Sequence, residues 1–377
     1  MNKRIPAIVL LLVLPLCASA QIRPAGPGAL VSAERLLEQG RLEQAERLLA
    51  GQLRRNPREP NALNLMGTLR ARQQKYDEAE RLFRAAIQAQ PGFVGARLNL
   101  ALLYLQSNDP ATATQILEQA AQIPPLDKEV GTVLAALYLR SGRPEWAARQ
   151  YQAVMEAHPG SVETLRALAR LQAQGGDARG AAALLNRAQQ LAPNSEVVLR
   201  EYAQAALQVG SPADATRAMS AAVRMNPYEA DYHYLLGIAY VWMGNAPDGI
   251  APLQRATELQ PDRAAFHLAL GMVQNSQKRF VEARQALDRC LALSPGQPSA
   301  LYLLAEVAQG ENELDRAEGL ARRVLESEAR HAGANLVLGT VLLKRGDLEG
   351  ARQALEIAAQ ADPSSARTHY QLSLVYA

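Results

Sequence analysis

Small and large apolar residues recur along almost the whole chain at an interval of 34 residues. One set of positions holds only Ala or Gly: Ala45, Ala79, Ala113, Ala147, Ala181, Ala215, Gly249, Ala283, Ala317 and Ala351. A second small set reads Ala33, Gly67, Ala101, Ala135, Ala169, Ala203, Gly237, Gly271, Ala305 and Gly339. A larger apolar set follows the first by four residues: Leu49, Phe83, Leu117, Tyr151, Leu185, Met219, Leu253 and Leu287. Residues four apart share a helical face, and two helices approach closely where side chains are small, so the pattern predicts repeated helix pairs.

Prolines mark the end of each unit with the same period. They stand at Pro57, Pro91, Pro125, Pro159, Pro193, Pro227, Pro261, Pro295 and Pro363, and Ala329 occupies the one missing place. Because proline lacks the amide hydrogen and clashes with the preceding turn, we expect it to end the second helix of each pair. Gly or Asn separates the two helices in most units, which suits a left-handed cap. At Gln74 and Lys278, which take that place in two units, we expect a slightly altered turn.

This pattern resembles the tetratricopeptide repeat family, whose unit is a helix–turn–helix of 34 residues. The resemblance implies an all-α fold, a right-handed superhelical solenoid, with ten repeats over residues 29–365. The Trp typical of the first helix is absent, and Leu63 and Leu165 stand in its place. Residues 366–377 look like the first helix of another unit, either as a half repeat that caps the array or as a repeat that is truncated.

The first twenty residues have a different character. Lys3 and Arg4 precede an apolar run over residues 5–16, and Ala18-Ser19-Ala20 matches the small-residue cleavage rule. We therefore predict a secretory signal peptide over residues 1–20, followed by a Pro/Gly-rich linker over residues 21–28. The expected location is periplasmic or secreted.

Two alternatives concern anchoring. Cys17 could be a lipidated cysteine. In lipoprotein signals, however, the residue directly before that cysteine is small, and here it is Leu16. The apolar run is too short for a stable transmembrane helix, and we expect no membrane-spanning segment in the mature chain. The mature chain could still be part of a membrane-associated complex. After cleavage Cys290 is the one remaining cysteine, which excludes an intramolecular disulfide.

Composition restricts the class of partner. Removing Lys3 and Arg4 from the 40 basic residues leaves 38 against 37 acidic ones, so the mature chain is nearly neutral and nucleic acid is not an expected partner. Aromatic residues make up only 5% of the chain although 48% is hydrophobic, because Ala and Leu dominate. Both are strong helix formers, in agreement with the predicted helix pairs.

Catalytic and metal-binding patterns are not found in the sequence. His233 and His267 occupy the same position in successive units, which places them about 10 Å apart, too far for a shared metal ion. We interpret them as partly buried packing residues, and Cys290 as a small core residue. There is no Gly-rich phosphate loop. We therefore expect no enzyme activity, no cofactor and no metal ion.

Family resemblance implies that the first helices line a concave groove that binds ligands. Arg166 and Arg170 lie one turn apart on one such helix, and Arg200 stands at the Arg166 position of the next unit. These arginines suit a carboxylate or an acidic peptide, because a guanidinium group binds a carboxylate through two hydrogen bonds. The alternative is a solvated face on which Glu163 and Glu196 are local salt-bridge partners.

A second group of groove positions is aromatic and apolar. It comprises Tyr234, Ile238, Val241, Trp242, Leu268, Met272 and Tyr302. Exposed residues of this kind would anchor a peptide. The alternative is that they pack against the next repeat.

Two ligand modes known in the family do not fit these positions. The carboxylate clamp of chaperone-binding members would place Lys and Asn where this chain has Arg166 and Arg170, but Glu201 and Leu235 occupy its following places. The asparagine ladder of the O-GlcNAc transferase superhelix requires Asn in every unit, and only Asn99 matches.

The predicted function is a non-catalytic scaffold that holds an extended peptide or a partner subunit in the concave groove. Two alternatives stay open. The array could be the repeat portion of an exopolysaccharide-export or outer-membrane assembly protein, or the recruiting arm of a glycosyltransferase whose catalytic domain is missing.

Overall fold

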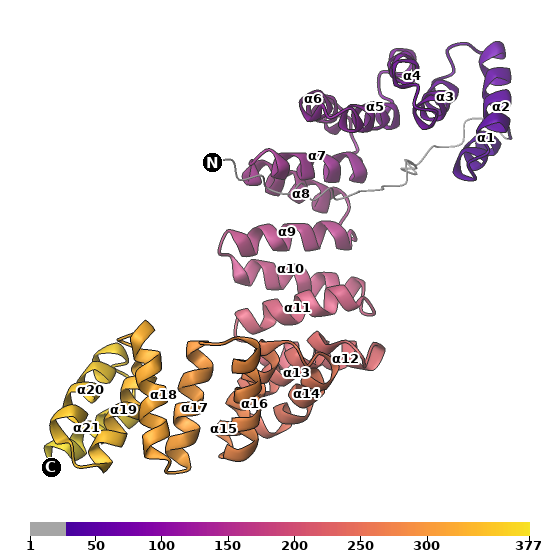
Figure 1. Ribbon diagram of the computed structural model, residues 1–377. Helices are drawn as coiled ribbons and strands as arrows, with labels where there is room; N and C mark the ends of the chain where they lie inside the picture. The colour runs from indigo at the N-terminus through magenta and orange to yellow at the C-terminus, as the bar shows by residue number, and fades with distance from the viewer. Residues whose placement is uncertain (1–27) are drawn as a thin grey trace. The chain divides into compact units, whose positions relative to one another are not determined.

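The computed structural model describes residues 28–377, and this part of the chain is built from helices with no strand (Figure 1). The first helices of the predicted pairs are α1 (Ala29–Glu38), α3 (Pro60–Arg72), α5 (Val94–Gln106), α7 (Lys128–Arg140), α9 (Val162–Gln174), α11 (Glu196–Gln208), α13 (Ala230–Trp242), α15 (Ala264–Ser276), α17 (Pro298–Gly310), α19 (Ala332–Lys344) and α21 (Ala366–Tyr376). The second helices are α2 (Leu42–Arg55), α4 (Tyr76–Ala89), α6 (Pro110–Ala121), α8 (Pro144–Ala157), α10 (Ala178–Leu191), α12 (Pro212–Met225), α14 (Ala246–Leu259), α16 (Phe280–Leu293), α18 (Leu314–Ser327) and α20 (Leu348–Ala361). The predicted signal peptide, with Cys17, and all but the last residue of the predicted linker lie outside the described residues.

The helix boundaries follow the predicted period. From α3 onward, every first helix begins 34 residues after the one before it, as at Pro60, Val94 and Lys128. The chain divides into two compact units, each of several repeats; the first ends at Gly176 and the second begins at Asp177. Within each compact unit, every helix packs on the next one along the chain, so the fold is an all-α repeat solenoid.

The two small-residue sets lie where the helices of a pair meet, as predicted. In α15, a Cβ added to Gly271 would lie 2.6 Å from Leu287 Cγ of α16, and in α13 one added to Gly237 would lie 2.5 Å from Leu253 Cγ of α14. Leu253 and Leu287 are both fully buried. The larger apolar residue of the second helix therefore occupies the space that a small residue leaves on the first helix.

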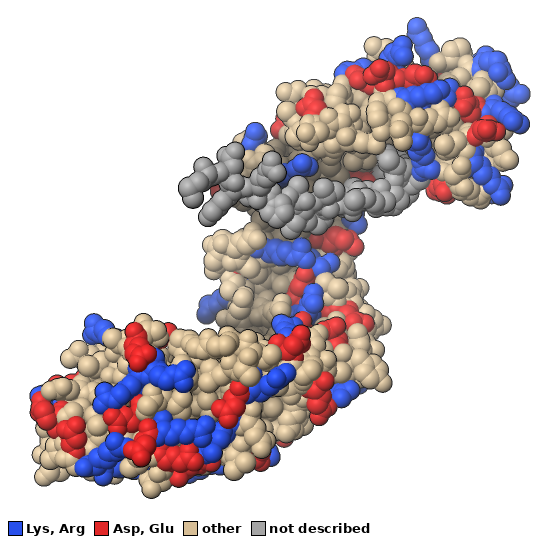
Figure 2. All heavy atoms as spheres, viewed as in Figure 1, with Lys and Arg blue, Asp and Glu red and all other residues tan. Residues whose placement is uncertain are grey.

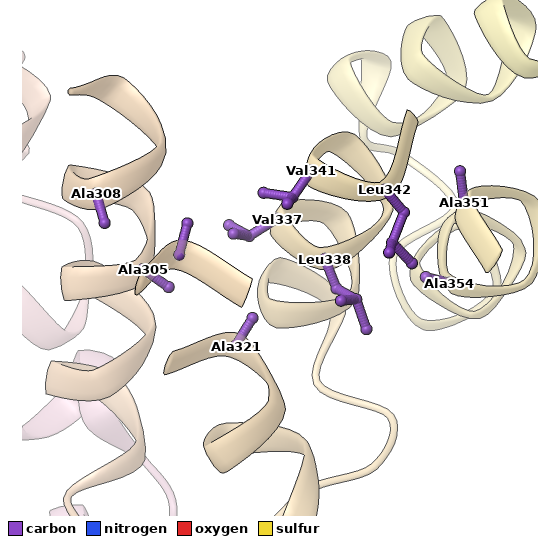
Figure 3. Close-up of a cluster of buried hydrophobic side chains, with 10 residues drawn as sticks. Ala305, Ala308, Ala321, Val337, Leu338, Val341, Leu342, Ala351 and Ala354 are labelled. Atoms are coloured by element: carbon purple, nitrogen blue, oxygen red, sulfur yellow. The ribbon is translucent and has the colours of Figure 1, made fainter. Parts of the chain in front are cut away.

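The core continues from repeat to repeat through small and branched side chains. Figure 3 shows such a cluster, in which Ala305 of α17, Ala321 of α18, and Val337 and Val341 of α19 approach one another. All four are buried. Because Ala costs little side-chain entropy on burial, close contact between helices stabilises this core without many large residues.

The turns inside the helix pairs adopt one conformation, and our expectation for two of them was wrong. Gly40, Asn108 and Gly142 have the positive φ of a left-handed cap. Gln74 and Lys278 have φ values of 61° and 57°, the same conformation rather than an altered turn. The reason is that the hydrogen bonds closing the helix end depend on the backbone and not on the side chain, so packing of the repeat imposes them on Gln and Lys as well.

Eight of the ten second helices in residues 28–377 end two residues before their proline, in agreement with the prediction. Helix α2 ends at Arg55 and α4 at Ala89, in each case two residues before the proline. The residue directly before Pro57 is the extended cap Asn56, in agreement with the restriction that proline places on its predecessor.

Polar contacts also join successive repeats. The hydroxyl of Tyr138 donates to Glu118 of the preceding second helix at 2.9 Å, and the hydroxyl of Tyr104 donates to Glu80 at 2.7 Å. Burial raises the pKa of Tyr138 to about 12, with a further contribution from the Glu118 carboxylate. Both tyrosines thus donate a hydrogen bond to the preceding repeat. Within residues 28–377, no helix combines the length and the apolar character needed to cross a membrane.

Candidate functional site

The first helices form the inner side of the stack in the second unit. Each contacts the first helix of the next repeat, from α11 with α13 through to α19 with α21. No two second helices in the described part of the unit make contacts as extensive. Closer spacing on one side means that the stack curves toward that side, so the first helices of this unit line its concave surface.

Arg166 and Arg170 lie on α9, in the first unit. Arg166 is half-buried and Arg170 is exposed. Burial raises the pKa of the Tyr151 hydroxyl in α8, and the positive charge of Arg170 opposes that rise. Glu163, one of the two expected salt-bridge partners, pairs with Lys128 at 3.2 Å.

Arg200 lies on α11, in the second unit, and is half-buried. Glu196, the other expected salt-bridge partner, accepts hydrogen bonds from the Tyr232 hydroxyl at 2.9 Å and from Asn226 Nδ2 at 3.3 Å. Burial raises the pKa of Tyr232 to about 12 together with the Glu196 contact, and the Arg200 charge opposes the rise. Glu196 therefore contacts two neutral donors, Asn226 at the end of α12 in its own repeat and Tyr232 on α13 of the following one.

Several residues of the predicted aromatic and apolar group pack between repeats. The Tyr234 ring stacks on Phe266 of the next first helix, with ring centroids 4.9 Å apart. Tyr302 lies 5.0 Å from the His331 ring. Leu268 is half-buried against the cluster that contains Leu304. Packing against the next repeat, the alternative interpretation, thus describes these three side chains.

Other members of the group remain accessible. Trp242, the last residue of α13, is 56% exposed, and Met272 on α15 is 38% exposed. Ile238 and Val241 are half-buried against the cluster around Ile250. The predicted group therefore divides into residues that hold neighbouring repeats together and two large apolar residues that face solvent.

Met272 borders a hollow on the inner side of the second unit. The hollow holds about 570 Å³, and residues that line it include Met272, Asn275, Leu303, Glu306, Gln309 and Arg367. These residues come from α15, α17 and α21, so four successive repeats surround the hollow, with Thr340 contributed by α19.

Sequence reasoning selected Met272 but not the polar lining. Glu306 stands at the same repeat position as Met272 and Arg170, and reading that position through every unit would have identified it. The guanidinium of Arg367 donates to Glu306 Oε1 at 3.3 Å and to Gln309 Oε1 at 2.9 Å. No sequence signal pointed to this contact, because it joins α21 to a helix two repeats earlier.

The first unit contains a smaller polar contact between first helices. Asn99 Nδ2 of α5 donates to Asn64 Oδ1 of α3 at 2.9 Å. Asn64 is buried and Asn99 is half-buried. Asn64 and Asn99 are 35 residues apart and so do not share a repeat position, and the contact joins two neighbouring first helices through non-equivalent residues.

The histidines of the repeated position have a structural role. His233 donates from Nε2 to the carbonyl oxygen of Pro227 at 2.9 Å, and His267 donates in the same way to Pro261 at 3.0 Å. Each ring therefore connects its helix to the proline that ends the preceding repeat. In residues 28–377, no group of three or more His, Cys, Asp or Glu side chains is placed to hold a metal ion. Cys290 is buried, which raises the pKa of its thiol.

The charged surface of the second unit has no single sign on the face that Figure 2 presents, because Lys and Arg side chains are interspersed there with Asp and Glu. Interspersed charges of opposite sign give this face no strong field of one sign.

Three solved structures illustrate what the chain is similar to. The Cut9–Hcn1 hetero-tetramer of the APC/C matches with a TM-score of 0.52 and 14% identity, over 93% of this chain and 83% of that one. PilW, a type IV pilus biogenesis factor, matches with a TM-score of 0.49 and 20% identity, over 56% of this chain and 98% of that one. MamA from Desulfovibrio magneticus RS-1 matches with a TM-score of 0.42 and 24% identity, over 45% and 96%. The first of these supports the fold alone.

A comparison with curated proteins finds no matching relative. Family comparison, by contrast, matches tetratricopeptide repeats over residues 30–92, 70–137, 138–205, 202–241, 234–298 and 302–366. These ranges cover nearly all of the helical part of the chain and agree with the observed helix pairs. The chain belongs to the tetratricopeptide repeat family.

Proposed function

We propose that the inner face of the second unit binds an extended segment of a protein partner. Tetratricopeptide repeat proteins bind protein partners, and the chain belongs to that family. The observation that carries the proposal is the position of Trp242 and Met272, two exposed large apolar side chains on first helices, of which Met272 borders the hollow. Exposed anchors beside a concave site are typical of the residues that dominate peptide affinity.

The anchors have different tasks in this proposal. Met272 is flexible and polarisable, so it adapts to side chains that enter the hollow. Trp242 supplies a large rigid surface with one hydrogen-bond donor, which suits an extended backbone that passes over it. The scaffold itself contributes no chemical step. Its helices are ordered before binding, which reduces the entropic cost of association.

We also propose that the arginines of the predicted basic group contact acidic groups of the partner, each within its own unit. Arg166 and Arg170 would serve the first unit and Arg200 the second. A guanidinium retains donors for a carboxylate when it already has one contact, because it carries five N–H groups in a planar fork.

Site-specific photo-crosslinking tests the binding face. A benzophenone amino acid placed singly at Trp242, Met272 or Arg170 is expected to crosslink one partner protein in the native cell extract. Val281, an exposed residue on the second helix α16, is the control position and is expected to give no such product. Equal amounts of crosslinked product from Val281 and from Met272 would contradict binding at the inner face. So would the lack of a crosslinked product from both Trp242 and Met272.

We propose that the chain acts outside the cytoplasm, in the periplasm or after secretion. Support comes from the sequence of residues 1–20 alone. Expression of the full chain in a bacterial host is expected to yield a mature protein that begins at Gln21, as measured by intact mass. A retained N-terminus would contradict export, and a mature chain that begins with a lipid-modified Cys17 would instead support the lipoprotein alternative.

A further inference from the structure

One of the cationic side chains that line the hollow on the inner face, Arg367, already contacts two acceptor groups there. Arg367, in the first turn of α21, extends past α19 to Glu306 and Gln309 on α17, two repeats earlier. Glu306 and Gln309 are three residues apart and therefore lie on one face of α17. The two terminal nitrogens of the Arg367 guanidinium donate one hydrogen bond each, to Glu306 Oε1 at 3.3 Å and to Gln309 Oε1 at 2.9 Å.

The Glu306 carboxylate is held in place by neutral groups. Its second oxygen accepts a hydrogen bond from Asn275 Nδ2 at 3.3 Å. The Tyr302 hydroxyl also interacts with it. Burial raises the pKa of Tyr302, and the Glu306 charge raises it further. Among the described residues, Arg367 is the one salt-bridge partner of Glu306, so the charge of this largely buried carboxylate is balanced by a single cation.

Gln309 is oriented for the same cation. Its side chain is only 7% exposed, and its Oε1 faces the Arg367 guanidinium. The other end of the amide, Nε2, is buried and has no hydrogen-bond partner in residues 28–377. A buried amide nitrogen without an acceptor is unfavourable. The amide nevertheless keeps its oxygen toward the hollow, where a cationic donor is required.

Arg367 can leave this position without any movement of the helices. Its side chain is 54% exposed, and rotation about its own bonds would carry the guanidinium into solvent. The space that it would vacate is bordered by Met272 and Leu303, which are suited to contact the aliphatic part of an incoming side chain. Lys278 and Lys344 also line the hollow. They would repel a second positive charge placed next to the side chain that enters, so an entering segment with two adjacent cations is disfavoured.

We propose that Glu306 and Gln309 form a socket for an arginine side chain of the bound partner, and that Arg367 occupies this socket when the partner is absent. The proposal rests on the proposed function, in that the inner face receives an extended segment. It adds the chemistry of one position of that segment, a single arginine flanked by apolar or acidic residues. It also makes Arg367 an internal competitor that the ligand must displace.

Competition of this kind has a measurable consequence. The apparent dissociation constant of a ligand equals its intrinsic value divided by the fraction of molecules in which the competitor has left the site free. If Arg367 fills the socket in about nine molecules of ten, its removal strengthens arginine binding about tenfold. Removal of the Glu306 charge abolishes the preference for arginine, because the site then lacks the carboxylate that pairs with a guanidinium.

The full chain and three variants test the socket: Arg367→Ala, Glu306→Gln and the double variant. The first probe is ethylguanidinium, titrated while the side-chain amide signals of selectively labelled glutamine are followed by NMR. We expect the Gln309 signals to shift with a dissociation constant about tenfold lower in Arg367→Ala than in the wild type, with no saturable shift in the double variant. Equal titrations in wild type and Arg367→Ala would overturn the proposal, as would equal titrations in Arg367→Ala and the double variant.

The second probe is a pair of peptides, acetyl-Leu-Arg-Leu-amide and its citrulline counterpart, which has the same shape without the charge. Arg367→Ala is expected to bind the arginine peptide at least about tenfold more tightly than the citrulline peptide, and equal affinities would overturn the socket. Should Arg367→Ala not fold, as judged by far-UV circular dichroism, Arg367→Gln removes the charge and keeps a hydrogen-bond donor.

The two proposals fail in different ways. Continued crosslinking from Met272 with no guanidinium binding in Arg367→Ala would remove the socket and leave the binding face. Guanidinium binding in Arg367→Ala with no crosslink from the inner face would support the socket's chemistry and remove the proposed function.

Discussion

Replacement of Phe266 by alanine is expected to lower the free energy of unfolding of the second unit by about 3–5 kcal/mol. Phe266 is 0% exposed and packs with Ala230 and Ala256. It also stacks on Tyr234, and Arg263 lies over its ring with the guanidinium carbon 4.4 Å from the centroid. Truncation would leave a cavity between two successive repeats and remove both ring contacts, so the loss includes more than transferred area.

The measurement is urea denaturation followed by circular dichroism, with Tyr228→Ala as the matched control. Tyr228 lies near α13 as well but is 76% exposed, and its removal is expected to change stability by less than about 0.5 kcal/mol. Comparable losses in the two variants would show that Phe266 does not hold the repeats together. An array unfolds through neighbouring repeats, so the effect is expected in the transition of the second unit.

The substitution Ala283→Leu is expected to destabilise the fold by about 1–3 kcal/mol through overpacking. Ala283 is fully buried in α16, in the set of small residues that lies between the helices of each pair. A Cβ added to Gly271 in α15 would lie 3.2 Å from the carbonyl oxygen of Ala283, so the two backbones are already close. Three further carbon atoms have no space there unless the helices separate.

Ala292→Leu is the control for that variant. Ala292 lies on the same helix and is exposed, so the same change in helix propensity occurs without any clash. Thermal unfolding of both variants gives the comparison. A stable Ala283→Leu variant with an unchanged Tm would mean that the close approach of α15 and α16 is not needed.

Repetition made the fold predictable from the sequence. A single Ala or Pro has many explanations, but Ala283 recurs in phase with Gly271 and Leu287, and the same three positions recur in unit after unit. A single repeat is too small to bury its apolar face alone, so the residues that contact the next repeat are needed in every repeat. The turn at Gln74 shows the limit of this reasoning, because the side chain suggested a deviation that the backbone does not make.

The candidate site was predictable only in part. Trp242 and Met272 were identified from their repeat position, and both are exposed. Tyr234 was selected for the same reason but packs on Phe266, because the spacing of adjacent first helices brings the two rings into contact. Repeat position states which face a residue occupies. It does not state how closely the next repeat approaches that face.

The sequence by itself determined the architecture of each repeat. Helix pairs, their ends and their small-residue contacts depend on residues within about one repeat of each other. Only the tertiary structure decided which inner-face side chains are free to meet a partner and which are already engaged. The contact of Arg367 with Glu306 and Gln309 is the clearest case, because it spans two repeats. Contacts of that range depend on the curvature of the stack, which sums small rotations between repeats and leaves no periodic signal in the residues themselves.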